Sequence, residues 1–313
     1  MTDSFIAARE DLARRRRGRV DKVTTLSAAL DLVADGDHVA IGGCLYSRTP
    51  WAALMELLRK RRTGLVLSRN LMCYEGDLFL VAGASSHLLT SWMGIGLPWG
   101  VSRVMRRHVE SGRAHLEEWS HLAIGLRFRA AAMGVPFLPS LTMLGSDLHR
   151  RASTEEMTCP FTGERLALIP ALYPDVALVH AHRADRHGNA RIEGYAHMDP
   201  DIVRAARTVI MTTEEIVEPG VFEADGARTS IPFFAVDAVV EVPFGSFPHE
   251  CYGRYDADFA HFDEYVAATG DDAGVAAYLD RWVYGMPGHE ALLAEFGDQR
   301  LRAAEARAAE VLS

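Results

Sequence analysis

The chain has 313 residues, of which 49% are hydrophobic and 24% are charged, with a formal net charge of −9 and an isoelectric point near 5.8. A protein of this size can bury a large core, as one large α/β domain or as one domain with a smaller appendage. The negative charge argues against general affinity for nucleic acids, and the sequence has no apolar run of about 18 residues that could span a membrane. The four cysteines include no Cys-x-x-Cys pair, which favours a reducing cytoplasm over a disulfide framework or a zinc site.

The start of the chain differs from the rest in its arginine content. Residues 1–20 are expected to form a helical N-terminal extension, followed by one domain over residues 21–313. Arg14–Arg17 is the one basic cluster, and neither an apolar segment nor a small-residue cleavage site follows it, so it is not a secretory signal. We interpret it as the solvated face of a helix.

Helical and strand patterns alternate through the domain. One strand should end at Gly42-Gly43, Thr49-Pro50 is predicted to cap and begin the next helix, and a helix over Leu122–Met133 should end at Gly134. Strands are predicted at residues 37–41, 65–67, 137–138, 176–179, 209–211 and 238–242. This alternation predicts an α/β fold with a largely parallel sheet flanked by helices, followed by a helical C-terminal region.

A dense cluster of polar residues follows the strand predicted at 176–179. Strand ends of this kind collect ligands in open α/β sheets. Two of its histidines would share one face of a strand, so the cluster could supply metal ligands. Neutral histidines at a strand end more often hydrogen-bond nearby carbonyl groups and order a loop, so we expect that role and no metal. The cluster consists of His180, His182, Asp185, His187 and Asn189.

Several standard signatures are absent from the sequence. It has no Gly-x-Gly-x-x-Gly after a strand, no P-loop, no Gly-x-Ser-x-Gly elbow and no His-Glu-x-x-His. These absences argue against nicotinamide oxidoreductases, P-loop NTPases, serine hydrolases and zincins. Two short motifs stay open. Gly42-Gly43 is either a tight turn or a close backbone approach to a ligand. Glu117-Glu118 is either a general acid/base pair or, as we expect, a solvated helix face.

Ten segments occur in order along the chain. They are Asp35-Gly36-Asp37 into Ile41-Gly42-Gly43 with Arg48-Thr49-Pro50, Glu117-Glu118-Trp119-Ser120, Gly134-Val135-Pro136-Phe137-Leu138-Pro139, Leu144-Gly145-Ser146-Asp147, Cys159-Pro160-Phe161-Thr162-Gly163-Glu164, Pro170-Ala171, Pro174-Asp175, Ala184-Asp185 with His187-Gly188-Asn189, Thr213-Glu214-Glu215-Ile216-Val217 and Val240-Glu241-Val242-Pro243-Phe244-Gly245. Together, from about residue 20 to residue 300, they closely resemble the alpha subunit of family I coenzyme A transferases of the glutaconate CoA-transferase type.

The resemblance implies a NagB/RpiA/CoA-transferase-like fold and a beta subunit of related fold, with the active site at the interface between the two. It implies a ping-pong reaction in which a glutamate attacks an acyl-CoA thioester, takes up CoA and passes it to a carboxylic acid. In the glutaconate type this glutamate belongs to the beta subunit, so we expect no nucleophile in this chain. Coenzyme A would be a substrate, no cofactor is implied, and the expected location is the cytoplasm.

The resemblance also suggests which loops of this chain shape the acyl site. His121 and Ser120 are the catalytic candidates. The resemblance implies an asparagine at the position of His121, and a histidine there could act as a base or bind a carboxylate. Cys44-Leu45-Tyr46 replaces smaller residues and would narrow the pocket. The substrate-binding candidates are Gly42, Gly43, Ser68, Arg69, Asn70, Gly145, Ser146, Asp147, His182 and Asn189.

Two other functions stay open. A related branch of the fold is a ring-opening hydrolase of CoA thioesters from steroid degradation, and a non-catalytic homologue is the third class. The sequence does not name the acyl group, because specificity depends on a few contacts. The aromatic stretch Phe244–Tyr255 should be covered by the second subunit or by the chain's own helices.

Overall fold

The computed structural model describes residues 5–14, 18–152 and 154–312. The helices are α1 (Phe5–Ala13), α2 (Leu26–Leu30), α3 (Trp51–Arg59), α4 (Glu75–Val81), α5 (Arg103–Glu110), α6 (His121–Met133), α7 (Asp147–Arg151), α8 (Asp199–Ala205), α9 (Gly220–Ala224), α10 (Phe259–Ala268), α11 (Asp272–Leu279), α12 (His289–Phe296) and α13 (Asp298–Leu312). Two short 3₁₀ helices (Gly226–Arg228 and Phe233–Ala235) and a π-helical turn (Asp280–Tyr284) complete the helical elements of the described chain.

The strands are β1 (His38–Ile41), β2 (Leu65–Ser68), β3 (Leu71–Met72), β4 (Ser85–Thr90), β5 (Trp92–Gly96), β6 (Gly100–Val101), β7 (His115–Glu118), β8 (Phe137–Ser140), β9 (Glu155–Thr158), β10 (Arg165–Pro170), β11 (Val176–Ala181), β12 (Arg183–Asp185), β13 (Ala190–Arg191), β14 (Thr208–Thr213), β15 (Ile216–Val217) and β16 (Ala238–Glu241).

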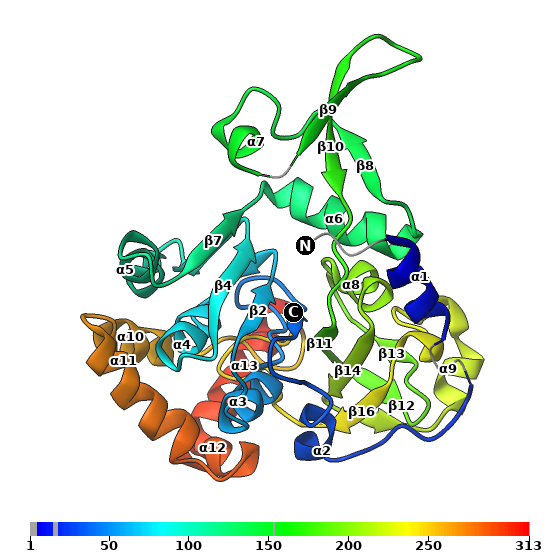
Figure 1. Cartoon of the computed structure of the whole chain (residues 1–313). Coiled ribbons are helices and arrows are strands. Elements are labelled where there is room, and N and C mark those ends of the chain that lie inside the picture. The colour runs from blue at the N-terminus through cyan, green and yellow to red at the C-terminus, as the bar shows by residue number, and fades with distance from the viewer. Residues whose placement is uncertain (1–4, 15–17, 153, 313) are drawn as a thin grey trace.

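A seven-stranded parallel sheet forms the centre of the molecule, in the order β16-β14-β11-β1-β2-β4-β7 (Figure 1). The chain runs outward from β1 through β2, β4 and β7, and then returns to the other side of β1 to run outward through β11, β14 and β16. The predicted parallel α/β sheet is therefore confirmed. Its strand order reverses between β1 and β11, and open α/β sheets bind ligands at the carboxyl ends of the strands at such a point.

Two hydrophobic cores cover the two faces of this sheet. One packs α2 to α5 and the C-terminal helices against it, with Phe79, Phe262 and Trp282 among its buried side chains. The other packs α6 and α8 against the opposite face through residues such as Phe128 and Val203. Figure 1 shows α10, α11 and α12 at the lower left and α6 above the parallel sheet, below β8, β9 and β10. The fold is an α/β/α sandwich with the expected helical C-terminal region.

The strand predicted at 137–138 is real, but it does not belong to the parallel sheet. It is β8, which pairs antiparallel with β10 in a separate sheet that projects at the top of Figure 1. Its residues are alternately exposed and half-buried, as expected of a strand with one solvated face, whereas β11 is buried throughout. The tip of the β9–β10 hairpin carries Phe161, which is 93% exposed.

The Glu117-Glu118 pair lies on β7, so the expectation of a solvated helix face was wrong. Neighbouring residues on a strand point to opposite faces of the sheet. Glu117 is half-buried and pairs with Arg127 of α6 at 2.6 Å, whereas Glu118 is exposed. The two carboxylates therefore do not act as a pair.

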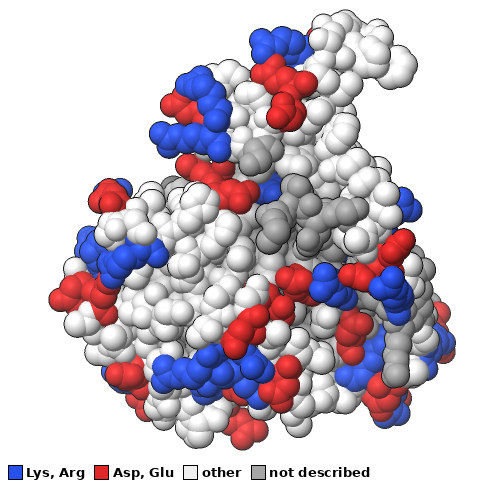
Figure 2. Space-filling view, in the orientation of Figure 1, with Lys and Arg blue, Asp and Glu red and all other residues white. Residues whose placement is uncertain are grey.

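The N-terminal extension contains α1, and Arg14 pairs with Glu10 and Asp11. Arg15–Arg17, the rest of the cluster interpreted as a solvated helix face, lie outside the described residues. Basic and acidic side chains are interspersed on the face that Figure 2 shows. Within the described residues, the helices are all too short or too polar to cross a membrane.

The aromatic stretch Phe244–Tyr255 is covered mainly by the chain itself. Phe247 is fully buried and its ring meets that of Phe296 edge-on at 4.8 Å. Tyr255 is 2% exposed and stacks on Phe244 at 4.8 Å. The sequence left open whether the second subunit or the chain's own helices would cover this stretch. The chain's own helices cover part of it, and Tyr252 remains 45% exposed.

Candidate active site

The loop after β1 occupies the point where the strand order reverses. The Gly42 amide donates to the Leu178 carbonyl of β11 at 2.8 Å, and Cys44 and Ser47 exchange backbone hydrogen bonds of 3.0 and 2.8 Å. Gly43 has φ +68°, and a Cβ there would lie 2.2 Å from the Ser47 carbonyl oxygen. The double glycine therefore makes a tight turn that another residue type cannot make.

This geometry predicts that Gly43→Ala destabilises the protein by more than the strain of its φ angle alone, which is about 1 kcal/mol. The matched control is Gly112→Ala, since Gly112 has φ +73° and open space around its Cβ position. Urea unfolding of both variants measures the difference. Equal losses of stability in the two variants would mean that the clash between the new Cβ and the Ser47 carbonyl oxygen adds nothing to the free energy lost.

A buried ion pair fixes the same loop from the side of α8. Arg48 and Asp199, 1% and 0% exposed, are joined by a hydrogen bond of 2.7 Å. The Gly43 amide donates to the other Asp199 oxygen at 2.8 Å. Arg48 also donates to the carbonyls of His180 and Tyr195 at 3.0 and 2.9 Å. One carboxylate and one guanidinium thus connect the ends of β1 and β11 with the start of α8.

A second buried ion pair, between Arg69 and Glu75, also contacts the glycine loop. Arg69 donates to Glu75 at 2.7 Å, to the Gly42 carbonyl at 3.2 Å and to the Thr49 hydroxyl at 3.0 Å. The Thr49 hydroxyl is also bonded to His249, so Thr49 does not cap α3 as predicted, and Pro50 is the residue that precedes this helix. Because Arg69 is fully buried, it acts on the glycine loop and does not reach the surface.

Asn70 and His121, from the ends of β2 and β7, meet at the carboxyl edge of the sheet. The Asn70 Nδ2 and the His121 Nε2 are 3.0 Å apart. An amide nitrogen only donates, so His121 accepts through Nε2. The Asn70 carbonyl accepts from Thr90 and Ser91, which fixes the backbone, while its Oδ1 is buried without a hydrogen-bond partner in the described structure. The first residue of α6 and a buried amide thus form one polar site.

Ser120 caps α6 and lies beside this site. Its Oγ accepts from the Ala123 amide at 3.1 Å and lies 2.7 Å from the hydroxyl of Thr142. Helix α6 ends at Gly134, with φ +70°, as predicted. Ser120 therefore has a structural role in placing His121 at the start of the helix.

The remaining candidates do not gather at one point. Gly145, in the loop that leads to α7, and Asp147, the first residue of α7, are exposed, and the Ser146 hydroxyl donates to the Met143 carbonyl at 2.6 Å. The Ser68 hydroxyl is buried and is bonded to His38 at 2.7 Å. These side chains therefore have partners other than His121 or face solvent, although Thr142 brings the start of the same loop to Ser120.

His182 and Asn189 are held by contacts within the chain. His182 donates from Nε2 to the Tyr252 carbonyl at 2.8 Å and accepts from the Glu193 amide at Nδ1, and burial lowers its pKa to about 4. Asn189 donates to Asp185 at 2.7 Å and accepts from the Phe233 amide at 3.0 Å. Both side chains order the hairpin of β12 and β13.

The histidine cluster that begins at His180, near the end of β11, does not converge on one point. His180 contacts Glu214 and Thr212, whereas His187 contacts the Val20 carbonyl. Burial alone would raise the pKa of Glu214, but hydrogen bonds from His180 and Tyr255 outweigh it and lower that pKa. These residues join strand ends to one another, so the alternative of a metal centre built from the whole cluster has no geometric support.

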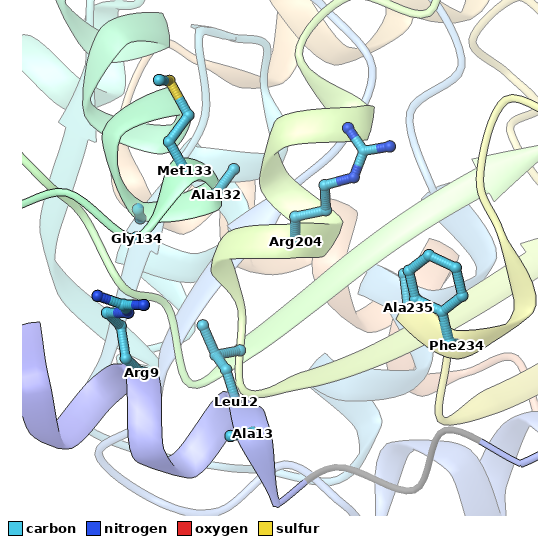
Figure 3. Close-up of a pocket in the computed structure, with 10 residues that line it drawn as sticks. Arg9, Leu12, Ala13, Ala132, Met133, Gly134, Arg204, Phe234 and Ala235 are labelled. Carbon is cyan, nitrogen blue, oxygen red and sulfur yellow. The ribbon is translucent and has the colours of Figure 1, made fainter.

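The chain also has a cavity of about 380 Å³ between α1, the end of α6 and α8 (Figure 3). It is lined by apolar residues such as Leu12 and Phe234, together with Arg9 and Arg204. It adjoins Gly134, and the thirteen residues of α6 place that end about 18 Å from His121. The cavity is therefore separate from the site at the carboxyl edge.

A family model described as coenzyme A transferase matches residues 23–242. The chain belongs to the coenzyme A transferase family. The A subunit of glutaconate CoA-transferase from Acidaminococcus fermentans is 32% identical over 90% of this chain and 94% of that protein. The crystal structure of glutaconate coenzyme A-transferase from this organism superposes with a TM-score of 0.86, also over 90% of this chain and 94% of the matched chain. The resemblance stated from the sequence and its implied fold are thus confirmed.

Other relatives of this chain are named for different activities. The crystal structure of a variant of the decarboxylase AibA/AibB is 32% identical, with a TM-score of 0.74 over 83% of this chain and 98% of that chain. One subunit of a cholesterol ring-cleaving hydrolase from Rhodococcus jostii is 28% identical over 78% of this chain and 86% of that protein. An uncharacterized protein from Archaeoglobus fulgidus is 37% identical over 87% of this chain, which spans only 61% of its length.

Two residues of the site, Asp199 and His197, were not predicted from the sequence. Asp199 is the first residue of α8, and its contact with the glycine loop joins positions 156 residues apart. His197 has φ +50°, and its Nε2 lies 3.3 Å from the Ser47 hydroxyl. Burial and the nearby Arg48 guanidinium lower the pKa of His197 to about 4. Neither residue belongs to any of the ten segments, and no local pattern in the sequence marks them.

Proposed function

We propose that this chain is the alpha-type subunit of a two-chain enzyme that moves CoA from an acyl-CoA to a carboxylic acid. The observation that carries the proposal is the similarity to the A subunit of glutaconate CoA-transferase, which covers 94% of that protein at 32% identity. The partner is a beta subunit that supplies the nucleophilic glutamate. The enzyme works in the cytoplasm, in keeping with four unpaired cysteines.

The chain's own contribution is to shape and polarise the acyl site. The backbone amides of Gly42, Gly43 and Cys44 donate to Leu178, Asp199 and Ser47, so they are already used within the chain. The side chains of Asn70 and His121 meet at the edge of the sheet, and Asn70 Oδ1 has no hydrogen-bond partner in the described structure. Asn70 and His121 therefore bind the acyl carbonyl or carboxylate, while the partner supplies the nucleophile.

The carboxylates of this chain fit poorly as nucleophiles. Glu75 is fully buried and paired with Arg69, and Glu117 is paired with Arg127. Glu193 lies 3.9 Å from Arg183, and Glu118, the last residue of β7, is exposed. A nucleophile must be free to approach the thioester carbon, and the ion pairs with arginine restrict Glu75 and Glu117.

A trapping experiment tests this division of roles. The chain is co-expressed with the protein of the adjacent reading frame, incubated with acyl-CoA, treated with borohydride or hydroxylamine, and analysed by peptide mass spectrometry. We expect the adduct on a partner glutamate. An adduct on Glu75, Glu118 or Glu193 of this chain would contradict the assignment.

The transfer itself is tested with the same two-chain preparation. We expect CoA to move from one member of a donor panel to an added carboxylic acid, with no turnover in the absence of the acid. Activity of the single purified chain as a monomer would contradict the two-subunit proposal.

The second candidate function is ring opening by hydrolysis. The similarity to the hydrolase subunit from Rhodococcus jostii supports it, whereas His121, which stands where the resemblance implies a glutamate in the hydrolase branch, favours the transferase. A hydrolase would consume its CoA thioester without an acceptor acid, and its partner would lack the nucleophilic glutamate. The acceptor dependence of turnover separates the two functions directly.

A further inference from the structure

Two histidines and a glutamate lie together on the outer strands of the parallel sheet, outside the proposed active site. His87 of β4 is paired in register with His115 of β7, and Glu117 follows two residues later on β7. Residues two apart on a strand point to the same face, so all three side chains lie on the face covered by α6. Their ligand atoms lie within 4.8 Å of one another.

The separation of His87 Nε2 and Glu117 Oε2 fits two ligands of one metal ion better than it fits a hydrogen bond. His87 Nε2 lies 3.6 Å from Glu117 Oε2, beyond the usual limit of about 3.2 Å for a hydrogen bond. Two atoms that bind one tetrahedral Zn²⁺, each at about 2.1 Å, are about 3.4 Å apart. His87 Nε2 is also buried without a hydrogen-bond partner in the described structure. The His87 and His115 rings meet at 4.8 Å, which keeps their nitrogens close.

Neighbouring residues fix the carboxylate in the orientation a ligand needs. Trp119 and Arg127 both donate to Glu117 Oε1, at 2.7 and 2.6 Å. Oε2 is thus left for the histidines. Hydrogen bonds to the second oxygen are typical of carboxylates that bind metals. Arg127 lies on α6 and is held over the Trp119 ring at 4.2 Å, so this support is rigid.

We propose that His87, His115 and Glu117 bind one divalent transition metal ion, with Zn²⁺ as the physiological ion. Two imidazoles and one carboxylate suit zinc, and water completes the tetrahedron because His115 is exposed. The ion joins β7, the outermost strand, to β4. Since β7 leads directly into Ser120 and His121, the ion also stabilises the approach to the proposed active site. This site departs from the expectation that the chain holds no metal.

The test measures binding to the full-length chain, stripped with a chelator and free of any histidine tag. Competition with a chromophoric zinc chelator should give one Zn²⁺ per chain. His115→Ala and His87→Ala should weaken binding by more than about 100-fold, since loss of even an outer partner costs about 10- to 100-fold. The matched control is His149→Ala, because His149 is bonded to a carboxylate of Glu156 at 2.7 Å without a second imidazole. It should bind as the wild type does.

A spectroscopic readout keeps the test independent of folding and of the proposed function. With Cu²⁺ as the probe, the electron paramagnetic resonance spectrum should show coupling to two imidazole nitrogens in the wild type and to one in His115→Ala. Zinc should raise the thermal unfolding midpoint of the wild type and of His149→Ala, but not that of His115→Ala. Absence of one-to-one binding, or unchanged affinity in both histidine variants, would overturn the proposal.

Discussion

His121→Ala should lower kcat/KM by about 100-fold while the protein remains folded, which is the usual size of a lost acid/base or positioning group. The side chain lies at the start of α6, and its Nε2 is 3.0 Å from Asn70 Nδ2. It can therefore be removed without opening a core. Steady-state kinetics of the two-chain enzyme with its own substrate measure the effect.

His121→Asn distinguishes the two ways in which His121 could act. An asparagine can accept the hydrogen bond from Asn70 and contact a substrate carboxylate, but it does not titrate. Recovery of most of the activity means that the residue binds and positions. A loss as deep as that of His121→Ala means that the imidazole moves a proton. The control is His187→Ala, which removes an imidazole that contacts the Val20 carbonyl. Wild-type kinetics in both His121 variants would place the acyl site elsewhere.

The sequence was enough to predict the framework of the site. The buried strand at 176–179, the double glycine after the first strand and the helix that ends at Gly134 are all present as predicted. These features are local: a run of apolar residues, a tight turn and a left-handed cap each follow from neighbouring residues. Because parallel strands end at one edge, Asn70 and His121 meet there, whereas the other predicted site residues do not gather at one point.

The contacts that arrange the site could not be predicted in the same way. Thr49 has the pattern of a helix cap, yet its hydroxyl is taken by Arg69 and His249, and the latter lies 200 residues away in the sequence. Glu117 has no sequence feature that marks it as a strand residue paired with Arg127. Which partner a buried polar group finds is decided by tertiary packing, and a single sequence contains no record of those distances.

Asp199→Ala should lower the free energy of unfolding by about 3–5 kcal/mol, because it leaves the buried Arg48 guanidinium without its counter-ion. It also removes the acceptor of the Gly43 amide. The matched control lies on the same helix: Asp201 pairs at 3.0 Å with Arg129, whose side chain is 59% exposed. Asp201→Ala should cost less than about 1 kcal/mol, as is usual for exposed pairs.

Urea unfolding of the two aspartate variants gives the comparison, and kinetics at a temperature where both are folded give the second readout. The Asp199 variant should lose activity even when folded, because the turn at Gly43 loses the carboxylate that connects it to α8, while the Asp201 variant should not. Two further outcomes separate stability from positioning. A large loss of stability with unchanged kinetics would show that the ion pair holds the fold but not the loop. Equal stability of the two variants would show that Arg48 finds other acceptors, such as the His180 and Tyr195 carbonyls that it already contacts.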